Sequence, residues 1–303
     1  MISTRSRIRA STLVARLESS EQTAHKLAEA VTDHFAAEGV AVNLSDAGGG
    51  RWQVAMHFRA APNEAAVRAA VAAAVGAKPA KALRFARVRA TDWVRGSLAG
   101  LAPVAAGRFI VHGAHDRARI PFNRIGVEID AALAFGTGHH GTTRGCLLAL
   151  DRICKLRRRH RRAPRILDVG TGSGVLGIAA ARSLRGHVLA TDMDVSAVRV
   201  ARANARINRV GPLVEIVTTD GVIAQNVRRH APFDLVFANI LLGPLQRMAA
   251  PLRRLIAPRG RIVLSGLLAA QANAAIAAYR PLALERRINL DGWTTLVLTR
   301  RLF

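Results

Sequence analysis

A buried strand that passes into a helix across three closely spaced glycines constrains the fold of this chain more than any other stretch. Residues 166–169 read Ile-Leu-Asp-Val, as in a buried strand that ends near a carboxylate, Gly170, Gly172 and Gly174 follow, and a helical apolar pattern occupies residues 175–181. Glycine adopts positive φ without steric cost and leaves no Cβ in the way, so the backbone can turn tightly and contact a ligand at the strand end. The pattern predicts a nucleotide-binding loop in an α/β domain.

Two classes of cofactor fit this loop. Gly172, Gly174 and Gly177 satisfy the G-x-G-x-x-G spacing of dinucleotide-binding proteins. Asp168 places a carboxylate at the strand end, which suits the ammonium or sulfonium of S-adenosylmethionine better than a pyrophosphate. Asp192 ends the next predicted strand, where a carboxylate binds ribose hydroxyls in both classes. The sequence favours S-adenosylmethionine; a dinucleotide, or a glycine turn without any ligand, is the alternative.

A second glycine-rich stretch precedes another predicted helix. It covers residues 133–138 and continues through His139 and His140 to Thr142 and Thr143, either of which is expected to cap the helix. Two glycine loops in one domain imply a ligand held from both sides, and an ordinary helix start is the alternative. We expect no metal site, because the histidines have no carboxylate or further histidine nearby in sequence and no Cys/His cluster has zinc spacing.

The net charge of the chain indicates the kind of partner that it could bind. The chain has 45 Lys and Arg against 20 Asp and Glu, a formal net charge of +25. This excess fits work near an anionic surface, so we expect a ribosomal RNA contact through a basic surface, with free use of arginine by the genome as the alternative. Residues 157–162 hold the densest cationic run. A solvated loop is the first interpretation of that run, and an RNA or ribosome contact is the second.

Cysteine usage and hydropathy indicate a cytoplasmic protein without a membrane partner. Cys146 and Cys154 lie eight residues apart in one predicted helix, which separates them by about 12 Å and puts them beyond disulfide reach. The sequence contains neither a continuous apolar run long enough for a transmembrane helix nor a signal-peptide pattern.

The chain divides into three predicted parts. Residues 1–91 alternate as β-α-β-β-α-β, the order of ferredoxin-like domains. Residues 92–130 mix glycine, proline and short apolar runs, and we interpret them as a connecting segment. Residues 131–303 alternate strands and helices and close with a hairpin at 283–299. The predicted fold is α/β: a doubly wound, mostly parallel seven-stranded methyltransferase sheet with a small N-terminal ferredoxin-like α+β domain.

Four stretches together resemble the methyltransferases that modify ribosomal protein L11. They are residues 133–138 with His140, Thr142 and Thr143, residues 167–174, residues 192–194 and residues 238–241. The resemblance covers the chain from about Asp92 onward, and the N-terminal domain agrees in outline. His139 replaces a threonine of the family pattern and Gly141 replaces a proline, which leaves any role of His139 open.

The resemblance implies a cofactor, a substrate and a set of site residues. The cofactor is S-adenosylmethionine, the acceptors are lysine and N-terminal amines of ribosomal protein L11, and the N-terminal domain is expected to recognise that substrate. The implied cofactor-binding residues are Thr143, Gly170, Gly172, Asp192 and Asn239. Asp220 could reach an adenine. We assign no catalytic residue, because Asn239 can only orient an amine through its carbonyl and His140 is a weaker candidate for proton transfer.

Two other functions compete with this one. An RNA base-amine methyltransferase would fit the positive charge, but such enzymes commonly carry Asn/Asp-Pro-Pro-aromatic where residues 239–242 read Asn-Ile-Leu-Leu. A ribosome-assembly factor could keep the fold without activity. Intact Asp168, Gly170, Asp192 and Asn239 argue against loss of the site.

Overall fold

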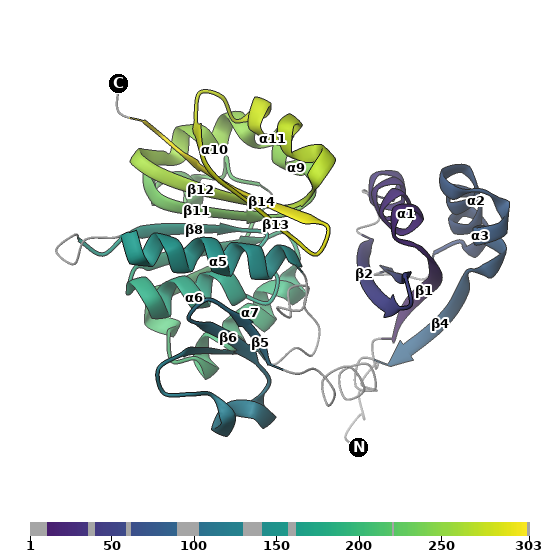
Figure 1. The fold of residues 1–303 in the computed structure, drawn as a ribbon, viewed down its shortest axis with the longest axis horizontal. Coiled ribbons are helices and arrows are strands. Elements are labelled where there is room, and N and C mark those ends of the chain that lie inside the picture. The colour runs from purple at the N-terminus through teal and green to yellow at the C-terminus, as the bar shows by residue number, and fades with distance from the viewer. Residues whose placement is uncertain are drawn as a thin grey trace, which may run out of the picture. The chain divides into compact units, whose positions relative to one another are not determined.

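The computed structural model describes residues 11–35, 40–58, 62–89, 103–129, 141–156, 162–219 and 221–301. The chain forms two compact units, Met1–Ala99 and Gly100–Phe303 (Figure 1). Each unit has its own core, and each is described by itself below.

The first unit is a four-stranded antiparallel sheet with helices α1, α2 and α3. Its strands pair in the order β2-β3-β1-β4, which confirms the predicted ferredoxin-like arrangement. Ser20 caps α1 and Asn63 caps α2, each by accepting a backbone hydrogen bond. The short helix α3 was not predicted. The elements are β1 Ser11–Ser20, α1 Glu21–His34, β2 Ala41–Gly48, β3 Arg51–Phe58, α2 Glu64–Val75, α3 Ala77–Ala82 and β4 Arg84–Arg89.

A seven-stranded sheet forms the centre of the second unit, as predicted. The strand order is β10-β9-β8-β11-β12-β14-β13, with the first five strands parallel and β14 antiparallel to both of its neighbours. The strands are β8 Arg165–Val169, β9 His187–Asp192, β10 Val214–Thr218, β11 Phe233–Asn239, β12 Ile256–Leu268, β13 Ala283–Leu290 and β14 Trp293–Thr299. The chain leaves β8 first toward β9 and later returns to β11 on its other side, which creates the switch point where doubly wound sheets bind ligands.

Helices cover both faces of this sheet. Helices α5, α6 and α7 form one layer, and α9, α10 and α11 form the other (Figure 1). The helices are α5 Gly141–Leu156, α6 Val175–Leu184, α7 Val195–Ile207, α8 Gln225–Arg228, α9 Leu242–Arg247, α10 Ala249–Leu255 and α11 Ala272–Ala278, with 3₁₀ turns η3 Gly211–Leu213 and η4 Ala269–Gln271. A single helix was predicted over residues 245–256. The structure has two, because Pro251 has no N–H to continue the hydrogen-bond ladder from α9.

Residues 104–128, which the sequence analysis assigned to a connecting segment, form a three-stranded sheet within the second unit. Its strands are β5 Val104–Ala106, β6 Phe109–His112 and β7 Ile125–Glu128, with the 3₁₀ turn η2 Ala114–Arg119 between β6 and β7. Arg108 Nε lies 2.6 Å from Asp151 Oδ1 on α5, and so ties the sheet to that helix. Strands of three or four residues are too short to show a period, and tertiary pairing decides them.

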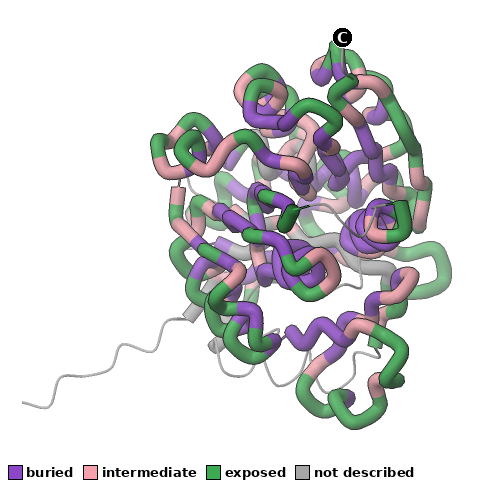
Figure 2. Tube along the Cα trace, turned by 90° about the vertical axis from the view of Figure 1, so that its left-hand side faces the viewer, coloured by how far each residue is buried: buried purple, intermediate pink, exposed green. Residues whose placement is uncertain are grey.

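The core of the second unit lies between the sheet and its helices. Figure 2 shows buried residues gathered along the inner strands and exposed residues on the outer turns. Leu167, Val236, Ile262 and Leu296 have no more than traces of exposed surface. Tyr279 is fully buried, and its hydroxyl donates to Leu245 O at 3.0 Å. Among the described residues, no helix combines the length and the apolar character needed to cross a membrane.

Candidate functional site

The carboxyl ends of three neighbouring strands bring the predicted site residues together. Gly170 follows β8, Asp192 ends β9 and Asn239 ends β11. Strand β8 lies between the other two, with Val169 opposite Thr191 of β9 and Ala238 of β11. The register therefore places Gly170, Asp192 and Asn239 on one edge of the sheet, where ligands of such sheets bind.

The glycine loop depends on backbone conformations that other residues rarely adopt. Gly170, Gly172 and Gly174 have φ of 66°, 55° and 84°. A Cβ built on Gly170 would lie 2.7 Å from Ile240 Cγ2, which is closer than carbon atoms approach. The loop after β8 therefore runs directly against the residue that follows β11, and it can do so only with glycine at position 170.

Asp192 joins the loop to the second strand. Its Oδ2 accepts a hydrogen bond from Gly172 N at 2.9 Å, and its Oδ1 accepts one from Asp194 N at 2.9 Å. Burial raises the pKa of this carboxyl group above its ordinary value, although the residue keeps some exposed surface. A carboxylate has about four acceptor positions, so at least one remains beside the backbone donors Gly172, Asp194 and Met193 to accept a hydrogen bond from a ligand hydroxyl. Two of the predicted residues, Gly172 and Asp192, are thus in direct contact.

Asp168 organises the loop from inside the protein. Its side chain is buried, and its Oδ2 accepts from Thr171 Oγ1 at 2.6 Å and from Gly177 N at 2.9 Å. Burial raises the pKa of Asp168 to about 6. The sequence placed this carboxylate at the strand end facing a cationic ligand group. The structure instead shows it bonded to the loop and to the first turn of α6.

Thr142, rather than its neighbour Thr143, reaches Asn239. Helix α5 begins at Gly141, so both threonines lie in its first turn and neither precedes it as a cap. Asn239 Nδ2 donates to Thr142 Oγ1 across a long 3.5 Å, whereas the Thr143 side chain is 1% exposed. The Thr142 carbonyl accepts from Ser265 Oγ at 3.2 Å, which fixes the start of α5 to β12.

Ile240 lies against two glycines, one of which is Gly170. The other, Gly266, has φ of 81° within β12, where the pairing with β14 shifts register between Leu264 and Leu267. A Cβ on Gly266 would overlap the carbonyl of Ile240 and lie 3.1 Å from its nitrogen. A glycine inside an otherwise apolar strand is the signal of such a close backbone approach.

A buried asparagine that the sequence pattern does not single out also contacts the glycine loop. Asn204 on α7 is fully buried, and its Nδ2 donates to Ser173 O of the glycine loop at 2.8 Å. Asn208 in turn donates from Nδ2 to Asn204 O at 2.8 Å and accepts from Glu128 N of β7 at 2.9 Å. Both asparagines continue the buried stripe of α7 that contains Val198, and a polar residue on such a stripe is the signal for a satisfied internal contact.

Several predicted features lie outside the described residues. These are residues 133–138, His139, His140, Asp220 and most of the arginine run at 157–162. The last member of that run, Arg162, is described, and its Nη2 lies 3.6 Å from Asp234 Oδ1. In the part of the chain that the structure describes, no group of three His, Cys, Asp or Glu residues is arranged to hold a metal ion.

Comparison with known proteins gives a consistent result. The family model for "Ribosomal protein L11 methyltransferase (PrmA)" matches residues 11–301. A ribosomal protein L11 methyltransferase of Rhodopseudomonas palustris (strain BisB5) is 48% identical over 294 residues, which cover 96% of this chain and 98% of the relative. One from Bradyrhizobium diazoefficiens is 47% identical over 283 residues, covering 93% and 95% of the two chains. The crystal structure of a ribosomal protein L11 methylase from Lactobacillus delbrueckii subsp. bulgaricus shares the fold at a TM-score of 0.57 and 24% identity, covering 67% of this chain and 100% of that one.

Proposed function

Because the chain belongs to the ribosomal protein L11 methyltransferase family, we propose that it transfers methyl groups from S-adenosylmethionine to lysine and N-terminal amines of ribosomal protein L11. The observation that carries this proposal is the meeting of Gly172, Asp192 and Asn239 at the carboxyl edge of β8, β9 and β11. That edge offers a carboxylate for hydroxyl groups, a loop without side chains and an amide beside it.

The residues at this edge fit S-adenosylmethionine. Gly170 and Gly172 leave the backbone open to the cofactor, and the lone pairs of Asp192 that remain can accept from ribose hydroxyls. Thr143 belongs to the predicted set, and the first turn of α5 also brings Thr142 to this edge. When bound, the cofactor supplies a methyl group on a positively charged sulfur.

The acceptor amine has to be neutral and aligned with that methyl group. A lysine amine with a reference pKa near 10.4 is neutral in only about one molecule in two thousand at pH 7. The amide nitrogen of Asn239 faces Thr142, so its oxygen is the atom available to accept a hydrogen bond from the amine and orient its lone pair. Alignment of two reactants accounts for a large part of the rate in such transfers. We assign no proton acceptor.

Transfer of radiolabelled methyl groups tests the proposed function directly. The purified full chain is incubated with labelled S-adenosylmethionine and ribosomal protein L11, with and without ribonuclease, and in parallel with ribosomal RNA alone. We expect label in the protein irrespective of ribonuclease. Label in RNA would favour a base-amine methyltransferase, and label in neither would favour a non-catalytic assembly factor.

We further propose that the first unit docks ribosomal protein L11. This unit has a ferredoxin-like sheet, a fold that does not specify a function by itself. All the residues implied for the cofactor belong to the second unit, which leaves the first unit for a binding role. Docking raises the local concentration of the acceptor, to about the millimolar range for short flexible linkers. A chain that begins at Gly100 should then bind cofactor as the full chain does but lose most transfer to ribosomal protein L11. Equal transfer by both chains would contradict the docking role.

A further inference from the structure

Helix α7 presents a row of arginines that the proposed methyl transfer does not use. Arg199 and Arg206 lie on the helix, and Arg209 follows its end; all three side chains are exposed. We refer to Arg199, Arg206 and Arg209 as the arginine surface. Arg209 stays beside Arg206 because its backbone nitrogen donates to Arg206 O at 2.9 Å.

The helical spacing aligns these charges. At 100° per residue, positions 199 and 206 differ by about 20° around the helix, and the seven steps from one to the other rise about 10 Å along the axis. Arg182, at the end of α6, approaches the same helix end, because its Nη1 donates to Asn208 Oδ1 at 3.3 Å. Arg199 and Arg206 therefore form a strip along one side of α7, and Arg209 and Arg182 add cations at its C-terminal end.

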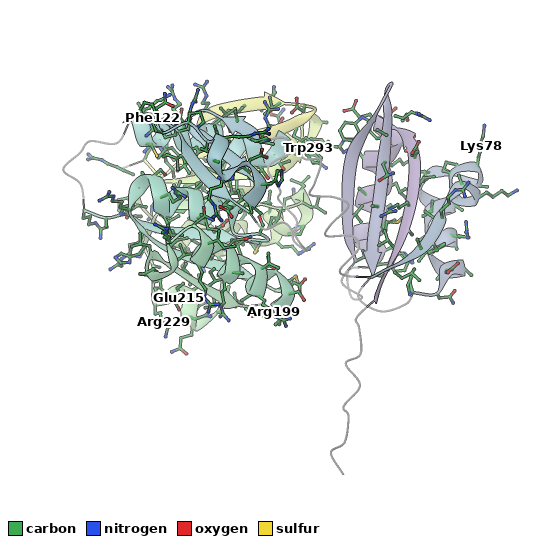
Figure 3. All side chains as sticks on the ribbon, turned by 90° about the horizontal axis from the view of Figure 1, so that it is seen from below. Lys78, Phe122, Arg199, Glu215, Arg229 and Trp293 are labelled. Carbon is green, nitrogen blue, oxygen red and sulfur yellow. The ribbon has the colours of Figure 1, made fainter. Side chains whose placement is uncertain are left out.

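Carboxylates do not neutralise this strip. From Val195 to Val214 the sequence contains neither Asp nor Glu. The nearest acidic side chain on the adjacent strand β10 is Glu215, whose oxygens lie 3.5 Å from Arg229 Nη2 and 3.1 Å from His230 Nε2. Figure 3 shows Arg199 on the same side of the unit as Glu215 and Arg229. Within the described residues, no ion pair involves a member of the arginine surface.

We propose that the arginine surface binds the phosphate backbone of RNA. The inference rests on the proposed function, since a ribosomal protein substrate brings the enzyme to RNA. A strip of about 10 Å spans several phosphates of a nucleic-acid duplex, and arginine matches phosphate through its planar set of donors. The exposed side chains of α7 include no aromatic residue on which a base could stack. Binding is therefore independent of base sequence and depends strongly on salt.

Fluorescence anisotropy with a fluorescein-labelled RNA duplex of mixed sequence tests the proposal on the full chain. The variant changes Arg199, Arg206 and Arg209 to Gln together. A control variant changes three other exposed arginines of the same unit, Arg254, Arg286 and Arg301, to Gln. Both variants carry the same net charge, so a difference between them reports position rather than total charge.

The salt dependence gives the expected size of the effect. Three lost phosphate contacts should lower the slope of log K against log salt by about 2 to 3. Between 50 and 200 mM salt, a fourfold change, the unmodified chain should therefore lose about 16- to 64-fold more affinity than the arginine-surface variant. The control variant should keep the original slope, and a triple change to Lys should restore binding.

Three results would overturn the proposal: no RNA binding by the unmodified chain, equal losses in both Gln variants, or binding to vesicles of anionic phospholipid but not to RNA. Methyl transfer to isolated ribosomal protein L11 is measured on the same samples. Retained transfer together with weakened RNA binding supports the RNA surface. If the unmodified chain transfers no methyl groups, the proposed function is refuted instead. Failure of the RNA proposal and failure of the proposed function are therefore distinguishable.

Discussion

Replacing Asp192 with alanine removes the carboxylate that connects the glycine loop to β9. Gly172 N and Asp194 N each lose an acceptor at 2.9 Å, and the cofactor loses the acceptor for its hydroxyls. Removing a charged acceptor from its donors costs about 1–3 kcal/mol. We therefore expect the Kd for S-adenosylmethionine to rise about 5- to 150-fold, at 1.4 kcal/mol for each tenfold change.

Isothermal titration calorimetry with S-adenosylmethionine measures this change, and Asp194→Ala is the matched control. Asp194 lies two residues away and caps α7 by accepting from Ser196 N at 2.9 Å. Losing that cap should lower the free energy of unfolding by about 0.5–2 kcal/mol and leave the Kd unchanged within a factor of about two. Unchanged affinity in Asp192→Ala, or an equal loss in both variants, would refute the role assigned to Asp192.

Three further substitutions test the environment of the site. The pKa of Asp168 is about 6 against an ordinary 3.8, so the folded protein holds this proton more tightly than the unfolded chain and loses stability as pH rises from about 4 to 6. Between pH 4 and pH 7, the free energy of unfolding of Asp168→Asn should rise by about 2.4 kcal/mol relative to that of the unmodified chain, measured by urea denaturation. A difference that does not change with pH would contradict this. Gly266→Ala should lower the free energy of unfolding by about 2–5 kcal/mol, because the new Cβ would strain a left-handed backbone and overlap with Ile240. A loss below about 1 kcal/mol would be inconsistent with this close approach. Asn204→Ala should weaken S-adenosylmethionine binding by about three- to tenfold, because it removes the hydrogen bond that holds the Ser173 carbonyl. Tyr279→Phe also removes one buried hydrogen bond but should leave the Kd unchanged. Equal values of Kd in both variants would count against Asn204.

The parts of the site that follow strand order were predictable from the sequence. Gly170 and Asp192 each end or follow a strongly apolar strand, and parallel strands place their carboxyl ends on one edge. The sequence therefore indicated that they meet, and the structure adds the bond between Gly172 and Asp192. The choice between Thr142 and Thr143 depended on where α5 begins, and the residues of a helix start cannot be fixed to within one or two positions by pattern.

Features set by contacts between distant segments were not predictable. The short strands β5, β6 and β7 pair through tertiary contacts, and β6 and β7 are parallel although only twelve residues separate them. The helical stripe of α7 indicated which of its residues are buried, but not that Asn204 faces Ser173. Such contacts depend on how two helices and a loop pack, and local sequence carries no record of that packing.

Arg202 of α7 contacts the edge strand of the seven-stranded sheet. Strand β10 is the terminal strand of the seven, and an edge strand presents free carbonyls to which another chain can add a strand. The Nε and Nη2 of Arg202 lie 3.1 and 2.6 Å from Ile216 O, so one guanidinium donates two hydrogen bonds to the central carbonyl of this short strand. A charged side chain at that position protects the fold against edge-to-edge aggregation, a protection that a lysine, with its single flexible ammonium, would provide less rigidly.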